Sequence, residues 1–102
     1  MAQATTGIRL HVTFEVKDFD KFFELAKKCM EATRKEPGCL HYELFHDIAD
    51  ETKTKLAMIE HWESKEALME HAKSAHVKEF IEKTKDLAQA EPCLKQYYSC
   101  GY

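Results

Sequence analysis

Hydrophobic and polar residues alternate in three stretches of the chain. From Ile8 to Val16 the even positions are apolar and the odd positions are mostly polar, and this period of two predicts a half-buried β-strand. The same alternation returns from Cys39 to His46 and from Lys55 to Glu63, and the polar residues between these two stretches predict a hairpin loop. A shorter final strand is predicted from Leu94 to Cys100.

The segment after the first strand repeats its apolar residues at steps of three and four, which predicts an amphipathic helix. Asp18 precedes this helix as a capping side chain, and the helix is expected to end near Glu36. Pro37 and Gly38 stop it, because proline lacks a backbone donor and glycine tolerates the left-handed turn that often follows a helix.

Helical spacing returns after the third strand, in two parts. Ser64 and Ser74 are both suited to cap a helix, so the second helical region is expected to be broken in two. The spacing continues to Leu87, and Pro92 ends the pattern.

The predicted order of elements is β-α-β-β-α-β, which is typical of an α+β, ferredoxin-like fold with an antiparallel sheet and helices on one face. The even strand positions should pack on the helices, because the odd positions are the more polar set: Arg9, His11, Thr13, Glu15, His41, Glu43 and His61. The odd face also carries Phe45, Ala57 and Ile59, and we therefore expect a homodimer formed through the sheets.

Length and composition limit the classes of protein to consider. A chain of 102 residues has room for one domain, expected at residues 8–100 after a flexible stretch at 1–7. Its 15 basic and 18 acidic residues form no block of one sign, which argues against nucleic acid or a membrane surface as a partner. The start MAQATTG lacks the features of a secretory signal, so a soluble, cytoplasmic protein is expected. The cysteines are expected to be free thiols: Cys29, Cys39, Cys93 and Cys100.

Two stretches carry a resemblance to a known family. They read EPGCLHYELFHD at residues 36–47 and IEHWESKEALMEHAKSAHVKEF at residues 59–80. They combine a helix-ending Glu-Pro-Gly-Cys, a Glu-x-Trp strand end, a Ser-x-Glu-Ala-Leu helix start and two histidines five residues apart. In this order and spacing the chain resembles the antibiotic biosynthesis monooxygenase family from about residue 8 onward, with the poorest match in the last strand.

The resemblance implies a homodimeric α/β barrel and, among family members, oxygenases that act on quinols and polycyclic phenols without metal or flavin. Related barrels catalyse other reactions, so the fold alone does not decide the function. The family pocket lies between sheet and helices, which here implies one on the even face, roofed by the helices: Phe14, Tyr42, His46, Met58, Glu60 and Trp62, with Phe23, His71, His76 and Phe80 above.

Oxygenation without a cofactor requires a substrate anion that donates an electron to oxygen, so the protein must supply a base, an apolar pocket and donors to the anion. His71 is the candidate base, with Glu60 and Tyr42 as the polar groups that stabilise the anion. Trp62 is the candidate wall for an aromatic substrate, and the other candidate contacts are His76, Phe23, Phe80 and Met58.

Each of these residues also has a purely structural interpretation. His71 and Trp62 can simply complete the core, as can Tyr42, and His76 can cap a helix. Glu60 can pair with a lysine or with a partner subunit, since a buried carboxylate must be paired or protonated.

No metal or other cofactor is expected. His11, His41 and His61 share the odd face, but a metal site needs three or four ligands in a defined geometry, and polar residues in a dimer interior explain them better. No glycine-rich phosphate loop is present. In the resemblance, haem-degrading relatives have an Asn in the first strand, which this chain lacks, and a Trp and a His where His71 and Ile81 stand here, so haem degradation is disfavoured.

Two functions follow as hypotheses. The first is a cofactor-independent monooxygenase that acts on a small phenolic or quinol substrate. The alternative is a dimeric barrel that binds or isomerises a small molecule without redox chemistry.

Overall fold

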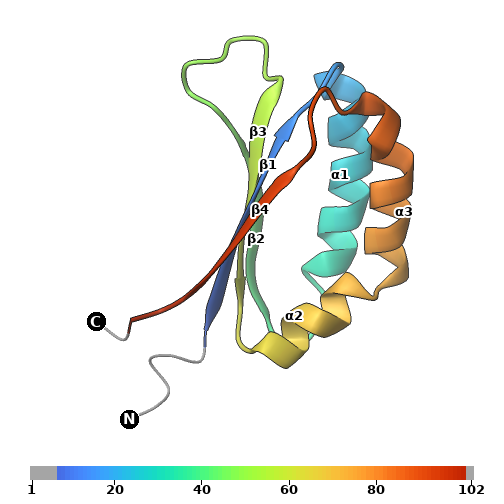
Figure 1. Ribbon diagram of the computed structural model, residues 1–102. Coiled ribbons are helices and arrows are strands. Elements are labelled where there is room, and N and C mark those ends of the chain that lie inside the picture. The colour runs from blue at the N-terminus through green and yellow to red at the C-terminus, as the bar shows by residue number, and fades with distance from the viewer. Residues whose placement is uncertain (1–6, 101–102) are drawn as a thin grey trace.

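A computed structural model of the chain describes residues 7–100, so the predicted flexible stretch at 1–7 lies outside the described residues apart from Gly7. The elements follow the predicted order (Figure 1): β1 (Ile8–Glu15), α1 (Phe19–Thr33), β2 (Cys39–His46), β3 (Lys55–Trp62), α2 (Lys65–Ala72), α3 (Ala75–Thr84), the 3₁₀ turn η2 (Lys85–Leu87) and β4 (Cys93–Tyr98).

The four strands form one antiparallel sheet in the order β2-β3-β1-β4. Figure 1 shows α1 and α3 side by side on one face of this sheet, while α2 crosses below them at the end of the layer. This arrangement confirms the α+β, ferredoxin-like fold. Among residues 7–100, no helix has the length and apolar character needed to cross a membrane.

The predicted caps are present. Asp18 accepts a hydrogen bond from the backbone N–H of Lys21, and Ser64 accepts one from the N–H of Ala67. Ser74 begins α3, so the second helical region is broken in two as predicted.

Helix α1 ends three residues before the predicted position. Its last residue is Thr33, and Glu36 lies in a tight turn in which its N–H donates to the carbonyl of Thr33. Gly38 follows with φ of 86°, a conformation that L side chains rarely adopt. The turn therefore releases Glu36 from the helix and leads directly into β2.

The even positions of β1 and β3 face the helices, as the alternation predicts. Ile8 and Leu10 of β1 are buried, and so are Leu56, Met58, Glu60 and Trp62 of β3. The core continues into the helices through Phe22, Ala26 and Phe80.

Two strands are less buried than their patterns predict. In β2 an irregularity between Cys39 and His41 shifts the register, and Leu40, which alternation assigned to the core, is 58% exposed. All of β4 is exposed although it pairs with β1 along its length, because it forms the edge of the sheet and no helix covers it.

Candidate active site

Two histidines share one carboxylate oxygen at the α2 end of the layer. The Oε2 atom of Glu36 lies 2.9 Å from Nδ1 of His71 and 2.6 Å from Nε2 of His76. Because a carboxylate only accepts hydrogen bonds, both ring nitrogens are donors in this arrangement. The remaining ring nitrogen of His71, Nε2, is then the acceptor of the neutral imidazole.

The break between α2 and α3 brings the two histidines together. His71 lies in the last turn of α2 and His76 in the first turn of α3. Ser74, between them, donates from Oγ to the carbonyl of His71 at 2.7 Å and lies 3.3 Å from Nε2 of His76. The capping serine thus fixes the turn that directs both rings toward Glu36.

Aromatic rings enclose His71. The ring of Trp62 lies 4.5 Å from that of His71 between centroids, and the ring of Tyr42 lies 5.4 Å away. Trp62 is fully buried, and Tyr42 and His71 are 6% and 5% exposed. The three side chains come from β3, β2 and α2, so the contact joins the sheet to the helical layer.

A second carboxyl group lies beneath this cluster. Glu60, 3% exposed, accepts a hydrogen bond of 2.8 Å from Nε1 of Trp62 and stands directly across from Tyr42 in the β2–β3 pairing. Burial raises the pKa of Glu60 to about 7, the Trp62 hydrogen bond opposes that rise, and the charge of Glu36 adds to it.

Burial also sets the protonation of Tyr42 and His71. It raises the pKa of Tyr42 well above its usual value, so the phenol keeps its proton. For His71, burial lowers the pKa more than the neighbouring Glu36 raises it, so the imidazole is neutral at pH 7. The site therefore holds a neutral base next to groups that can donate hydrogen bonds.

The structure brings together five of the predicted site residues and separates the other three. His71, Trp62, Tyr42, Glu60 and His76 form the cluster. Met58 is buried in the core. Phe23 stacks on Phe19 at 5.3 Å, with the ammonium group of Lys27 over its ring.

Phe80 belongs to a separate apolar pocket. This pocket has a volume of about 380 Å³ and lies between the sheet and α3, at the end of the layer away from α2. Its lining includes Phe14, Phe22 and Phe80 but neither His71 nor Trp62. The face predicted to form one pocket is thus divided into a polar cluster and an apolar cavity.

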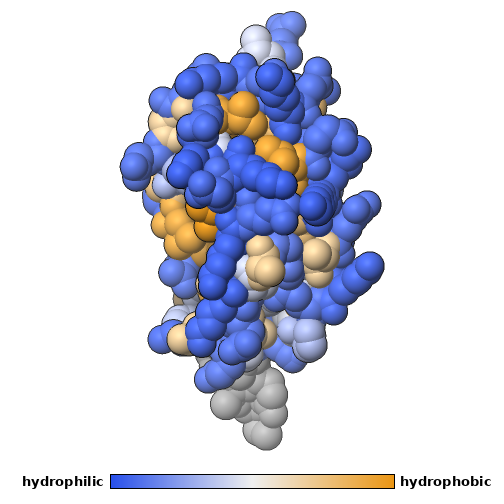
Figure 2. Space-filling model, turned by 90° about the vertical axis from the view of Figure 1, so that its right-hand side faces the viewer, coloured by the Kyte–Doolittle hydropathy of each residue, from blue (hydrophilic) through white to orange (hydrophobic). Residues whose placement is uncertain are grey.

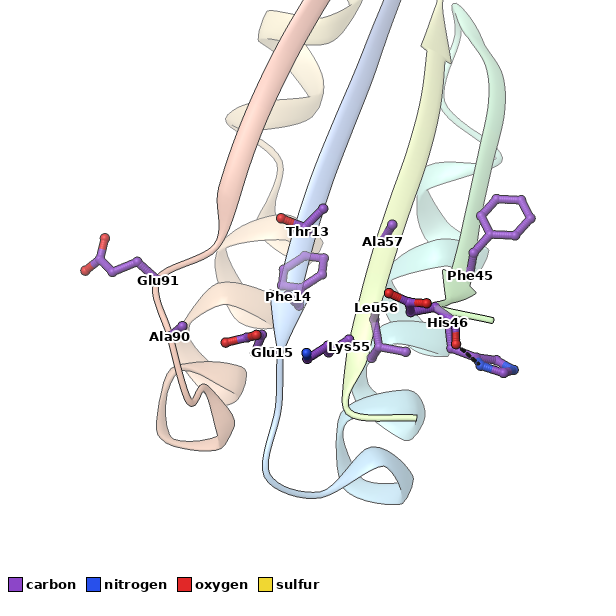
Figure 3. Close-up of a pocket in the computed structure, with 11 residues that line it drawn as sticks. Thr13, Phe14, Glu15, Phe45, His46, Lys55, Leu56, Ala57, Ala90 and Glu91 are labelled. Atoms are coloured by element: carbon purple, nitrogen blue, oxygen red, sulfur yellow. Dashed lines mark hydrogen bonds between the residues drawn. The ribbon is translucent and has the colours of Figure 1, made fainter. Parts of the chain in front are cut away.

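A second hollow opens at the same end of the sheet (Figure 3). Its volume is about 440 Å³, and β1, β2, β3 and the segment before β4 line it. His46, assigned to the even-face pocket by its position, lies at this rim instead, where its Nδ1 is 3.3 Å from the backbone carbonyl of Asp47. The rim also carries Glu15, Lys55 and Glu91, so it is polar as well as open.

On the odd face, His41 and His61 are opposite each other across β2 and β3, as the hairpin predicts. His11, however, faces Ile59 rather than His61. In the described part of the chain, the one group of three that could hold a metal ion is Glu36, His71 and His76, away from that face.

Glu36 is the member of this cluster that the sequence analysis does not identify as a candidate site residue. In the sequence it belongs to the Glu-Pro-Gly-Cys motif, whose pattern predicts only the end of a helix. It meets His71 and His76 across 35 and 40 residues of chain, a separation that no local periodicity detects. The signal that was available is an acidic residue held in a rigid Pro-Gly turn.

Comparison with known proteins identifies a matching family model and two related proteins. The family model for "Antibiotic biosynthesis monooxygenase" matches residues 8–83. An uncharacterized Synechocystis protein, sll1783, is 30% identical over 78 residues, which are 76% of this chain and 52% of the relative, so the match spans about half the relative's length. The Bacillus subtilis protein named "Putative monooxygenase YcnE" is 25% identical over 81% of this chain and 85% of its own.

A solved structure has the same fold as this chain. The crystal structure of a conserved protein from Methanosarcina mazei Go1 is similar with a TM-score of 0.89 and 27% identity, covering 95% of this chain and 96% of that one.

Proposed function

Because the chain belongs to the antibiotic biosynthesis monooxygenase family, we propose that it is a cofactor-independent monooxygenase of a small phenolic or quinol substrate. The observation that supports this most is the buried, neutral His71, held by Glu36 against the rings of Trp62 and Tyr42. A base kept neutral in an apolar surrounding is what the deprotonation of a phenol requires.

The proposed reaction begins with a proton transfer. Glu36 accepts a hydrogen bond from the Nδ1–H group of His71, which leaves Nε2 unprotonated. In the proposed step, Nε2 takes the proton from the substrate hydroxyl. We assign hydrogen-bond donation to the resulting anion to protonated Glu60 and the Tyr42 hydroxyl, and the raised pKa values of both groups support this role.

The electron transfers then involve only the substrate and oxygen. The anion gives one electron to O₂, and the radical pair combines to form a carbon–oxygen bond. His71 returns its proton to the peroxide. The carbon that carries the hydroperoxide also carries a hydrogen, and loss of this hydrogen with cleavage of the O–O bond releases water and leaves a carbonyl. In total, SH₂ and O₂ give SO and H₂O, where S is the substrate without the two hydrogens that leave.

Oxygen uptake by the metal-stripped protein tests the proposal. Against a panel of hydroquinones and polycyclic phenols, we expect uptake by the unchanged chain and its loss in His71→Ala. His41→Ala, which alters an exposed histidine paired with Glu43 on the other face of the sheet, is the matched control and should retain it. Absence of uptake across the panel would argue against the oxygenase.

A second candidate is an isomerase, and the presence of both His71 and Glu60 against Trp62 favours it. The neutral base His71 could remove a proton from one substrate atom, and the carboxylic acid Glu60, whose pKa is about 7, could return a proton to another atom. Such a transfer needs no oxygen. Exchange of substrate hydrogen for solvent deuterium under anaerobic conditions, without net oxidation, would distinguish this activity.

We also propose that the chain forms a homodimer through its sheets. The helix face in Figure 2 is predominantly hydrophilic, with separate apolar residues. By contrast, the open face of the sheet exposes two large apolar side chains, Phe45 and Tyr97, which pair with the odd positions Ala57 and Arg9. A second copy packed on the sheet would cover them.

A further inference from the structure

The polar groups that meet at Glu36 have the composition of a metal site. Glu36, His71 and His76 each present one ligand atom, and these three atoms all lie within 4.8 Å of one another. Across residues 7–100, no other histidine, cysteine or acidic residues come together in a group of three at this spacing.

We propose that Glu36, His71 and His76 form a binding site for a divalent transition-metal ion, with Zn²⁺ as the best-matched ion. Two imidazoles and one carboxylate are a ligand set that binds zinc and leaves a fourth position open. The same set disfavours Ca²⁺ and Mg²⁺, which prefer oxygen ligands throughout.

The three ligand atoms must change their spacing to admit the ion. In a tetrahedral zinc site with these ligands, neighbouring ligand atoms lie about 3.3 Å apart. The distances from Oε2 of Glu36 to Nδ1 of His71 and Nε2 of His76 are 2.9 and 2.6 Å. The carboxylate must therefore withdraw by a fraction of an ångström, and the two ring nitrogens, which lie within 4.8 Å of each other, must also reach this spacing. Each ring must move its proton from the nitrogen that faces Glu36 to the other nitrogen.

Charge and access also suit a cation. Among the described residues, the two histidines are the ion-pair partners of Glu36, and no lysine or arginine nitrogen lies within 4.0 Å of its carboxylate. The side chains of Glu36 and His76 are 16% and 25% exposed, so an ion can enter from solvent, whereas His71 is 7% exposed and anchors the inner side. Ser74 holds the turn between the two histidines and so limits how far they can separate.

The site overlaps the proposed base, and its consequence for activity rests on the proposed function. An ion on Nδ1 of His71 leaves the ring proton on Nε2, which can then no longer accept a proton from a phenol. Zn²⁺ is therefore expected to inhibit oxygenation rather than support it.

Calorimetric titration of Zn²⁺ into the metal-stripped, untagged full chain tests the site directly. The parent protein should carry Cys93→Ser and Cys100→Ser, because these exposed thiols are themselves zinc ligands. We expect one Zn²⁺ ion to bind per chain. Its affinity should fall by roughly tenfold or more in Glu36→Gln and in His76→Gln. Co²⁺ in place of Zn²⁺ should give the visible absorption of a tetrahedral site in the parent and lose it in both variants.

His41→Gln is the matched control. His41 lies 3.3 Å from Glu43, a histidine–carboxylate pair on the other face of the sheet without a third ligand, so its loss should leave the affinity unchanged. Equal affinity in the parent, Glu36→Gln and His76→Gln, or no saturable binding at millimolar Zn²⁺, would overturn the proposal. Both variants alter partly exposed side chains, and far-UV circular dichroism checks that each is folded.

The titration contains no substrate, so it is independent of the oxygenase assay. Failure of zinc binding leaves oxygen uptake by the metal-stripped protein unaffected. Absence of oxygen uptake, in turn, leaves the calorimetric result standing.

Discussion

In the proposed reaction, Glu36 determines which nitrogen of His71 acts as the base. Its Oε2 accepts the Nδ1–H bond at 2.9 Å, which leaves Nε2 unprotonated on the side away from the carboxylate. This tautomer depends on a residue 35 positions away in sequence, so the chemistry of His71 is set by the turn after α1 as much as by α2.

For activity, we predict that Glu36→Gln lowers kcat/KM by roughly a hundredfold or more, because the amide can present its N–H₂ to the ring and reverse the tautomer. The pH profile should change with it, since the glutamine removes the charge that raises the pKa of His71. Steady-state kinetics across pH measure both effects. A full pH profile that stays unchanged in Glu36→Gln would show that Glu36 has no part in positioning the base.

Glu60 makes the stability of the protein depend on pH. Its pKa is about 7 when folded, against an ordinary value of 4.5. Between these values the folded state holds a proton that the unfolded state has lost, so stability falls as pH rises from about 4.5 to 7 and then levels off.

The expected loss over this window is on the order of 3 kcal/mol in the free energy of unfolding. Glu60→Gln keeps an acceptor for Trp62 but cannot ionise. Between pH 4.5 and 8, the stability of this variant relative to the unchanged chain should therefore rise by that amount. Urea unfolding at several pH values measures it, with the exposed Glu31→Gln as control. A constant difference between Glu60→Gln and the unchanged chain would contradict a raised pKa.

At the scale of elements, the turn after α1 is tightly constrained. Gly38 has φ of 86°, and a Cβ built there would lie 2.6 Å from the Cβ of Ala67 in α2. The close approach brings the start of β2 against α2, the helix that carries His71.

We therefore predict that Gly38→Ala destabilises the fold by about 1 to 3 kcal/mol, from strain in φ together with the clash. The double variant Gly38→Ala with Ala67→Gly removes the clash and keeps the strain, so it should recover part of the loss. Chemical denaturation of the two variants separates these contributions. Unchanged stability in Gly38→Ala would mean that the turn relaxes freely.

The elements themselves were largely predictable, because alternation and helical spacing are local signals. Capping by Asp18, Ser64 and Ser74 was read correctly for the same reason. Leu40 was assigned to the core incorrectly, since a register irregularity in β2 leaves no trace in the pattern.

The site was only partly predictable. Alternation along β2 and β3 predicts that Trp62, Tyr42 and Glu60 share one face. The position of α2 over that face depends on tertiary packing, which no local pattern in the sequence predicts. Phe23 illustrates the limit: helical spacing places it near the apolar stripe, whereas in the fold it packs on Phe19 and Lys27.

At the scale of the whole molecule, the uncovered sheet is the feature that the monomer leaves unexplained. We predict a dimer in sedimentation analysis, and Tyr97→Glu should shift it to monomer, because Tyr97 is 47% exposed on the sheet. Ile81→Glu, 60% exposed on α3, is the matched control and should remain dimeric. A monomeric unchanged chain, or loss of the dimer only in Ile81→Glu, would contradict association through the sheets.

The central claim is that this molecule oxygenates its substrate with its own residues, and labelling with heavy-isotope O₂ tests it most directly. For any phenol or quinol in the panel that is turned over by the metal-stripped protein, the account predicts one labelled oxygen atom in the product and one in water, both lost in His71→Ala. Product oxygen that comes from solvent, turnover without O₂, or turnover that appears only after a metal or flavin is added would contradict it.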